Sequence, residues 1–220
     1  MRIIWKKTLR LAAAMTLVAA AASATALPVS IANHSFEDPS LVDGGFTVGT
    51  VTGWTVFGTS GVFNPTVGQL AQGPTDGFQV AYSNNTGLAL TQDLAATLMA
   101  NTFYSLMVDV QSRTDGVTHK SSTLQLRTVT DDILASATVG PLAGGTNFLL
   151  TANFSASAFD VNLGKNLRIA LISGGGQSDW DNVRLDATPL LVVPEPSSFL
   201  LALVGMGLAG VVGAKRRRST

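Results

Sequence analysis

The sequence of 220 residues contains no cysteine. This absence excludes disulfide bonds, thiolate metal ligands and thiol nucleophiles, so the fold must be held together by its own core. The chain also has only two histidines, His34 and His119, which are too few and too far apart to form a zinc site built on clustered His ligands. Neither lies in a context typical of a Ser–His–Asp triad, and no Gly-x-Ser-x-Gly motif is present.

Basic residues are scarce between the two ends of the chain. The whole sequence has 14 basic and 14 acidic residues and a formal net charge of zero. Four of the basic residues lie within the first ten positions and four within the last six, so residues 27–193 carry six basic and thirteen acidic side chains, a net charge of −7. A domain with this charge lacks the basic face that binding to nucleic acid or anionic lipid requires. We therefore expect no nucleic-acid partner.

The N-terminal segment has the layout of a secretory signal peptide. A basic start is followed by an apolar stretch at residues 11–22, which is too short to span a bilayer, and then by small residues. Cleavage after Ala24 or Ala26 fits the small-x-small pattern, and residues 1–26 are predicted to be removed. An uncleaved first transmembrane helix is the alternative.

The C-terminal segment combines a short proline motif, an apolar run and a basic cluster. Residues 189–197 form a linker that contains the motif, residues 198–214 lack charge and are long enough for a transmembrane helix, and residues 215–220 are predicted to stay in the cytoplasm. The motif consists of Pro194, Glu195 and Pro196, and the basic cluster of Lys215, Arg216, Arg217 and Arg218. A permanent single-pass membrane anchor is the plainer interpretation.

This tail resembles the PEP-CTERM sorting signal of Gram-negative bacteria in each of its elements. The resemblance implies that the protein is held in the inner membrane as an intermediate and is then cleaved near the motif by an exosortase. As with other cleaved C-terminal signals, no anchor helix would remain. The processed protein would then reach the cell surface or an extracellular polysaccharide matrix.

The segment between the ends, residues 27–188, is predicted to be all-β. Apolar residues alternate with polar ones over 104–110, 124–128 and 167–171, which is typical of half-buried strands. Glycine-rich and proline-rich joints separate many such short segments, and no stretch shows sustained helical periodicity apart from a candidate turn at 94–99. These patterns predict a jelly-roll β-sandwich.

Four short patterns in this segment resemble the galactose-binding-like jelly roll that many carbohydrate-binding modules share. They are Asn33-His34-Ser35-Phe36-Glu37, Gly53-Trp54-Thr55, Leu90-Thr91-Gln92-Asp93-Leu94 and Asp181-Asn182-Val183-Arg184-Leu185. The resemblance implies that the first and last of them lie side by side and that Glu37 and Asp181 hold a structural calcium ion, which prefers oxygen ligands. Alternatively, Glu37 pairs with an arginine or caps a turn, and Asp181 accepts backbone N–H groups.

Sugar binding would need aromatic faces that stack against the ligand. Trp180 and Tyr82 are the candidates for ligand binding, although Trp180 could equally pack in the core and Tyr82 could simply end a strand. By strand alternation, Trp180 is expected to face away from Asp181, Val183 and Leu185.

These features predict a non-catalytic surface or matrix protein with a structural or adhesive role in exopolysaccharide. A carbohydrate-binding module with a specific glycan ligand is the first alternative. A secreted hydrolase, with the acid pairs Asp131/Asp132 or Asp179/Asp181 in a glycosidase-like role, is the second. We expect no catalytic residues and no cofactor other than calcium.

Overall fold

The computed structural model describes residues 25–190 of the chain. Residues 1–24 of the predicted signal peptide, the sorting motif, the membrane helix and the basic tail lie outside this range. Every regular element within it is a β-strand, and none of its residues form a helix that could cross a membrane.

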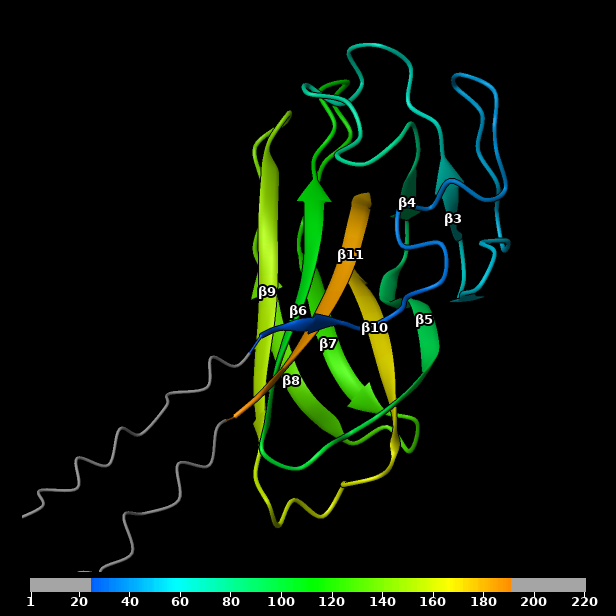
Figure 1. Ribbon diagram of the computed structural model, residues 1–220. Helices are drawn as coiled ribbons and strands as arrows, with labels where there is room; N and C mark the ends of the chain where they lie inside the picture. The colour runs from blue at the N-terminus through cyan, green and yellow to red at the C-terminus, as the bar shows by residue number, and fades with distance from the viewer. Residues whose placement is uncertain (1–24, 191–220) are drawn as a thin grey trace, which may run out of the picture.

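The strands form two antiparallel sheets. They are β1 (Leu27–Pro28), β2 (Thr55–Val56), β3 (Ser60–Phe63), β4 (Val80–Ser83), β5 (Thr86–Thr97), β6 (Thr102–Gln111), β7 (Ser122–Thr128), β8 (Ile133–Val139), β9 (Asn147–Ala156), β10 (Asn166–Gly174) and β11 (Ser178–Pro189). The first sheet has the order β3-β4-β11-β6-β9, with β1 added to β11, and the second has the order β2-β5-β10-β7-β8. Figure 1 shows the two layers packed face to face, which confirms the predicted β-sandwich.

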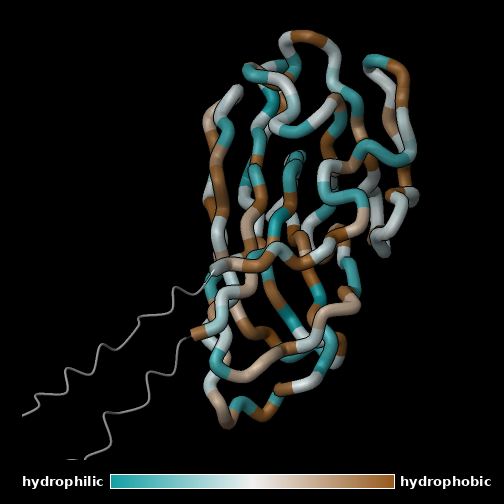
Figure 2. The backbone as a smooth tube through the Cα atoms, in the orientation of Figure 1, coloured by the Kyte–Doolittle hydropathy of each residue, from teal (hydrophilic) through white to brown (hydrophobic). Residues whose placement is uncertain are grey.

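The core lies between the two sheets and follows the predicted alternation. Figure 2 shows hydrophobic and hydrophilic positions alternating along the strands. The inward-facing residues of β6, β7 and β10 are buried, among them Tyr104, Leu106, Val108, Val110, Leu124, Leu126, Leu167, Ile169 and Leu171. The helical turn considered at 94–99 is wrong, because Leu94 continues β5 and its side chain is buried in the core.

Strand β11 departs from regular alternation at a bulge. Its pairing with β6 shifts between Asp181 and Arg184, and Asn182 adopts a φ of 54°, a left-handed conformation that Asn tolerates better than most residues. As a result Trp180 and Val183 both face the core, although their odd spacing predicts opposite faces. The expected separation of Trp180 from Val183 and Leu185 is therefore wrong.

The outer face of the first sheet is covered at one end by loops. Figure 1 shows these loops gathered beyond the ends of β3, β4 and β6. They create a second, smaller apolar cluster, separate from the main core, that consists of Phe63, Leu70, Val80 and Tyr82. This end of the sandwich therefore has buried surface on both sides of the sheet.

Truncation of a core leucine tests the assignment of the main core. Leu126 is fully buried between the sheets, so Leu126→Ala should lower the free energy of unfolding by about 2–5 kcal/mol through lost burial and a residual cavity. Urea unfolding followed by circular dichroism measures this change. Ile133→Ala is the control, because Ile133 is 56% exposed at the start of β8 and should change stability by less than about 1 kcal/mol. Equal effects of the two substitutions would contradict the core assignment.

Candidate functional site

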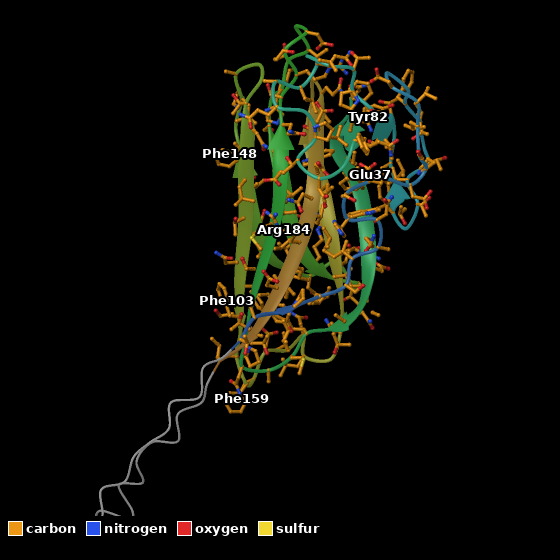
Figure 3. All side chains as sticks on the ribbon, turned by 45° about the horizontal axis from the view of Figure 1, so that its top comes forward. Glu37, Tyr82, Phe103, Phe148, Phe159 and Arg184 are labelled. Carbon is orange, nitrogen blue, oxygen red and sulfur yellow. The ribbon has the colours of Figure 1, made fainter. Side chains whose placement is uncertain are left out.

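A pocket of about 180 Å³ opens at the loop-covered end of the first sheet. Its walls combine three aromatic rings with amide and guanidinium groups, and they are formed by Phe46, Phe63, Tyr82, Asn84, Arg113 and Gln177. The ring of Tyr82 meets Phe46 and Phe63 edge to face, with centroid distances of 6.4 Å and 6.5 Å. Figure 3 shows Tyr82 at this end of the molecule.

Tyr82 is fixed in the pocket wall by its hydroxyl group, which donates a hydrogen bond of 2.8 Å to the carbonyl of Thr47. The segment at Thr47 can lie this close to the strand because residue 61, the cross-strand partner of Tyr82, is a glycine. A Cβ on Gly61 would lie 2.1 Å from the Thr47 carbonyl oxygen. Tyr82 is thus a rigid wall residue rather than a loose strand end. A role for it in ligand binding stays a prediction.

Trp180 lies on the opposite side of the sheet from this pocket. It is fully buried in the main core and is absent from the pocket wall. Its indole Nε1–H has no hydrogen-bond partner among the described residues. In this position its ring packs between the sheets, which is the packing alternative raised from the sequence.

Asp179 lies directly behind the pocket. In the sheet it pairs with Tyr82 of β4 on one side and with Gln111 of β6 on the other, so the three side chains share the outer face. The carboxyl group has no exposed surface. Gln177, a residue of the pocket wall, donates a hydrogen bond of 2.8 Å to Asp179 Oδ1, whereas Oδ2 has no partner.

This environment favours the neutral acid. Burial raises the pKa of Asp179 to about 7, against the opposing effects of the Gln177 hydrogen bond and the positive charge of Arg113. The neighbouring Gln111 Oε1 is a second buried acceptor without a partner. A protonated carboxyl group provides an O–H donor that a carboxylate lacks. Protonation of Asp179 therefore supplies a donor beside Gln111, whose Oε1 lacks a partner.

Arg113 connects the pocket to the protein surface. Asp115 accepts hydrogen bonds from both Nε and Nη2 of this guanidinium, with a distance of 2.9 Å from Nε to Oδ1. The guanidinium carbon lies 4.6 Å from the centroid of the Phe63 ring, and Nη1 approaches Gln177 Oε1 at 3.5 Å. The side chain is only 12% exposed. Arg113 is therefore held in one orientation against the pocket.

Asp181, two residues further along β11, also faces outward and is buried. The backbone N–H of Asp76 donates to its Oδ2 at 2.7 Å and that of Asn182 to its Oδ1 at 2.6 Å. Burial raises the pKa of Asp181 to about 7, although these backbone donors act in the opposite direction. Asp181 thus fastens the loop that precedes β4 onto the sheet.

Glu37 holds the same loop from the other side. Its Oε1 accepts hydrogen bonds of 2.8 Å from the N–H groups of both Phe78 and Gln79. Gly77 makes this possible, because its φ is +85° and a Cβ there would lie 2.4 Å from Glu37 Oε1. The opening and closing sequence patterns do lie side by side, as the N–H of Val183 donates to the carbonyl of His34 at 2.9 Å.

The side chains of Glu37 and Asp181 do not form a set of calcium ligands in this structure. Both oxygens of Asp181 and one oxygen of Glu37 accept backbone N–H groups, which is the alternative stated from the sequence. Among residues 25–190, no three His, Asp or Glu side chains are grouped so that they could hold a metal ion. We therefore derive no chemical step through calcium, and calcium binding stays a prediction.

Two further hollows lie outside this site. A hollow of about 540 Å³ is enclosed by the loop residues 64–78, and its only acid is Asp43. A groove of about 350 Å³ runs between residues 28–31 and β11 and contains Arg184, which Figure 3 shows further down the same sheet. Neither is lined by Phe46, Phe63 or Tyr82, or by the hydrogen-bond partner or cross-strand partners of Asp179, so the aromatic pocket is the stronger candidate.

The two histidines take no part in the site. His119 is buried, accepts a hydrogen bond from the N–H of Leu142 at Nδ1, and lies 3.0 Å from Ser122 Oγ through Nε2. Burial lowers its pKa. His34 is half-exposed, and its Nδ1 lies 3.6 Å from a carboxylate oxygen of Asp76. Neither histidine lines the aromatic pocket.

The buried acid predicts a specific dependence of stability on pH. Because the pKa of Asp179 is about 7 in the folded protein and about 3.8 when unfolded, the folded state binds more protons between these values. The free energy of unfolding should therefore fall as the pH rises from 4 to 7. Asp179→Asn, which mimics the neutral acid, should remove up to roughly 4 kcal/mol of this fall.

Urea unfolding of the wild-type protein and the variant at pH 4, 5, 6, 7 and 8 tests this expectation. Asp181, whose pKa is also raised to about 7, contributes a fall of the same sign, whereas the lowered pKa of His119 makes stability rise with pH. Both contributions cancel in the difference between the two proteins. Parallel curves for the two proteins would show that Asp179 ionises normally in the fold.

Calcium binding is tested separately by thermal unfolding. If the ion ties residues 33–37 to β11, the midpoint should rise with millimolar Ca²⁺ and fall again with a chelator, because a ligand that binds only the folded state stabilises it. Glu37→Gln should abolish the difference. Identical midpoints in Ca²⁺ and in chelator would exclude a structural calcium site.

Comparisons with known proteins assign both parts of the chain. The PEP-CTERM protein-sorting motif matches residues 192–218, which confirms the predicted sorting signal. This signal implies export across the membrane and processing by an exosortase. The family model described as HpiC1 cyclase matches residues 27–186. No curated protein matches the chain.

Solved structures of cyclases agree with the second assignment. The cyclase Fisc from Fischerella sp. TAU, in complex with (3Z)-3-(1-methyl-2-pyrrolidinylidene)-3H-indole, is 26% identical with a TM-score of 0.67, over 76% of this chain and 100% of that one. A cyclase from the same organism, in complex with 4-(1H-indol-3-yl)butan-2-one, is 26% identical with a TM-score of 0.66 over the same shares. The CBM22-1 xylan-binding domain of Paenibacillus barcinonensis Xyn10C is 16% identical with a TM-score of 0.45, over 79% of this chain and 100% of that one.

The sequence alone led to the expectation of a protein without enzymatic activity. That expectation is wrong, because both the family model and the similar structures at 25–27% identity are cyclases. Composition and motifs gave no sign of this chemistry, since a ring-forming enzyme needs neither a triad nor clustered histidines. The chain belongs to the HpiC1 cyclase-like family.

Proposed function

We propose that the exported domain is a cyclase that binds a small aromatic compound in the pocket of Phe46, Phe63 and Tyr82 and uses Asp179 as its proton donor. The observation that carries this proposal is a fully buried carboxyl group next to an aromatic pocket. Its pKa of about 7 keeps a large fraction protonated near neutral pH, where a general acid is most effective.

The size of the pocket favours a small ligand. A volume of about 180 Å³ is below the roughly 300–1,000 Å³ of typical sites for drug-sized molecules. A ring system with a short side chain fits this space better than an extended polysaccharide does. Two cyclase structures similar to this chain hold indole compounds, and an indole is therefore the ring we propose for this pocket.

The proposed reaction is an isomerisation and needs no oxidant or reductant. The proton of Asp179 is transferred to an alkene carbon of the substrate, and the π electrons of that bond form the new C–H bond. The electron-rich ring then attacks the resulting cation, which forms the C–C bond of the new ring. Loss of a proton from the ring restores its aromaticity and returns the proton to the Asp179 carboxylate.

The surrounding residues support this sequence of steps. The faces of Phe and Tyr rings attract cations, so the aromatic wall would stabilise the intermediate. Asp179 has no exposed surface, and the Gln177 side chain separates it from the pocket. Proton delivery therefore requires Gln177 to move aside when the substrate binds, after which the acid contacts the substrate directly.

The site of action follows from the sorting signal. Exosortase processing would release the domain from the membrane, and we propose that it then works at the cell surface or in the extracellular matrix. The predicted association with exopolysaccharide remains a proposal of its own. Large apolar side chains such as Val67, Phe78 and Phe159 are exposed on the described part of the chain, but none of them is a Trp or Tyr platform for sugar stacking.

Turnover tests the proposal directly. The protein, purified in its exported form from a producing strain, is incubated with indoles that carry an alkenyl chain at C3, and the products are analysed by mass spectrometry and NMR. We expect a product of unchanged mass that has lost its alkene signals. Asp179→Asn should lower kcat by about 10²–10⁴-fold, because general acid catalysis contributes on this scale.

Asp186→Asn is the matched control. Asp186 lies on the same strand, is half-buried and does not line the aromatic pocket, so its substitution should leave turnover unchanged. Full activity of the Asp179→Asn variant, with an unchanged pH profile, would overturn the assignment of the proton donor. Absence of any isomerised product from the whole substrate panel would overturn the proposed reaction.

A further inference from the structure

Arg113 places unused hydrogen-bond donors at the pocket. A guanidinium group carries five N–H donors, and the structure gives three of them partners: two on Asp115 and one, at 3.5 Å, on Gln177 Oε1. One N–H on each terminal nitrogen is left without a partner among the described residues. The side chain is only 12% exposed and lines the pocket, so these two N–H groups are available to a ligand bound there.

A second donor group lines the same pocket. Asn84 is exposed at the rim of the pocket, and its side-chain amide makes no hydrogen bond within residues 25–190, while its backbone N–H donates to the carbonyl of Thr59 at the end of β4. Arg113 and Asn84 thus bring N–H donors to a pocket whose other walls are mostly aromatic rings. Few polar groups at fixed positions in an apolar pocket are what determines ligand orientation and specificity.

The charges around Arg113 favour a neutral acceptor over an anion. Asp115 binds the guanidinium through two of its nitrogens and so compensates its charge. Asp179, close enough for Arg113 to affect its ionisation, would repel an anionic ligand whenever it is ionised. The group that fits these donors is a carbonyl oxygen, which accepts N–H bonds without carrying a full charge.

We infer that Arg113 is a specificity-determining residue, which selects aromatic substrates that carry a carbonyl oxygen on the side chain. This inference rests on the proposed function of the pocket. The stack of Arg113 on Phe63 and its attachment to Asp115 hold the donors still, so little conformational freedom is lost when the carbonyl binds. Substrates that lack the oxygen leave these donors desolvated and unpaired, which disfavours them.

Two indoles with the same carbon skeleton test the inference. 4-(1H-Indol-3-yl)butan-2-one carries a ketone, whereas 3-butylindole does not, and their affinities are measured by isothermal titration calorimetry. The wild-type protein should bind the ketone at least about tenfold more tightly, as expected for a hydrogen bond from a charged donor. This preference would run against hydrophobicity, since 3-butylindole gains more from burial.

Arg113→Met should reduce the preference to less than twofold while it keeps the affinity for 3-butylindole, because methionine retains packing against Phe63. Arg184→Met is the matched control: Arg184 lies on the outer face of the same sheet, outside this pocket, and its loss should leave the tenfold preference intact. Circular dichroism establishes that both variants are folded. If Arg113→Met does not fold, the affinities of the wild-type protein for the two ligands still test the inference.

Equal affinities of the wild-type protein for the two indoles would overturn the inference, as would a full preference in folded Arg113→Met. Either result leaves the role of Asp179 untouched, because turnover of alkenyl indoles is measured without a ketone. Failure to bind both compounds at millimolar concentration would overturn the inference as well. Loss of turnover in Asp179→Asn together with lost ketone preference in Arg113→Met supports both assignments.

Discussion

The arrangement of this domain depends on how β11 divides its side chains between the two faces of the first sheet. Trp180 points into the main core, whereas Asp179 points outward to the aromatic pocket. Because β11 lies in the middle of the sheet, between β4 and β6, its backbone at these two residues is paired with strands on both sides. The strand that anchors the core therefore also fixes the position of the acid.

Covering loops turn this outward face into a site. An outward-facing residue of a two-layer sandwich is normally in contact with water, and an aspartate there would ionise as usual. Here residues 64–79 pass over the sheet, held by Gln111, Asp181 and Glu37 through their side chains. The loop removes water from the outer face, and the desolvation that follows raises the pKa of Asp179. The carboxylates that hold the loop thereby shape the chemistry of a carboxyl group they do not touch.

The sequence was enough to predict the sandwich but not the site. Alternation over 104–110 and 167–171 identifies core strands because it reports burial directly, and the C-terminal motif identifies the sorting tail. Alternation gives the wrong face for part of β11, because the bulge at Asn182 adds one residue to the strand and no local sequence pattern predicts it. The residues that line the pocket come from five separate segments between Phe46 and Gln177. The topology of the fold brings these segments together. Gln177 is already near Asp179 in the sequence, but Arg113 carries no motif and lies 64 residues before Gln177, so only the fold brings it to this site.

The same architecture explains why a member of a cyclase-like family can look like a structural module in its sequence. A hydrolase of the Ser–His–Asp type must assemble a nucleophile, a base and an oxyanion site, and these leave recognisable patterns. Proton-initiated ring closure needs one acid that stays neutral and a dry, shaped surface around it. Burial meets both requirements. Because residues of any type can be buried, no sequence motif indicates it. In this domain the property on which the proposed chemistry depends, the raised pKa of the Asp179 carboxyl group, arises from its complete burial.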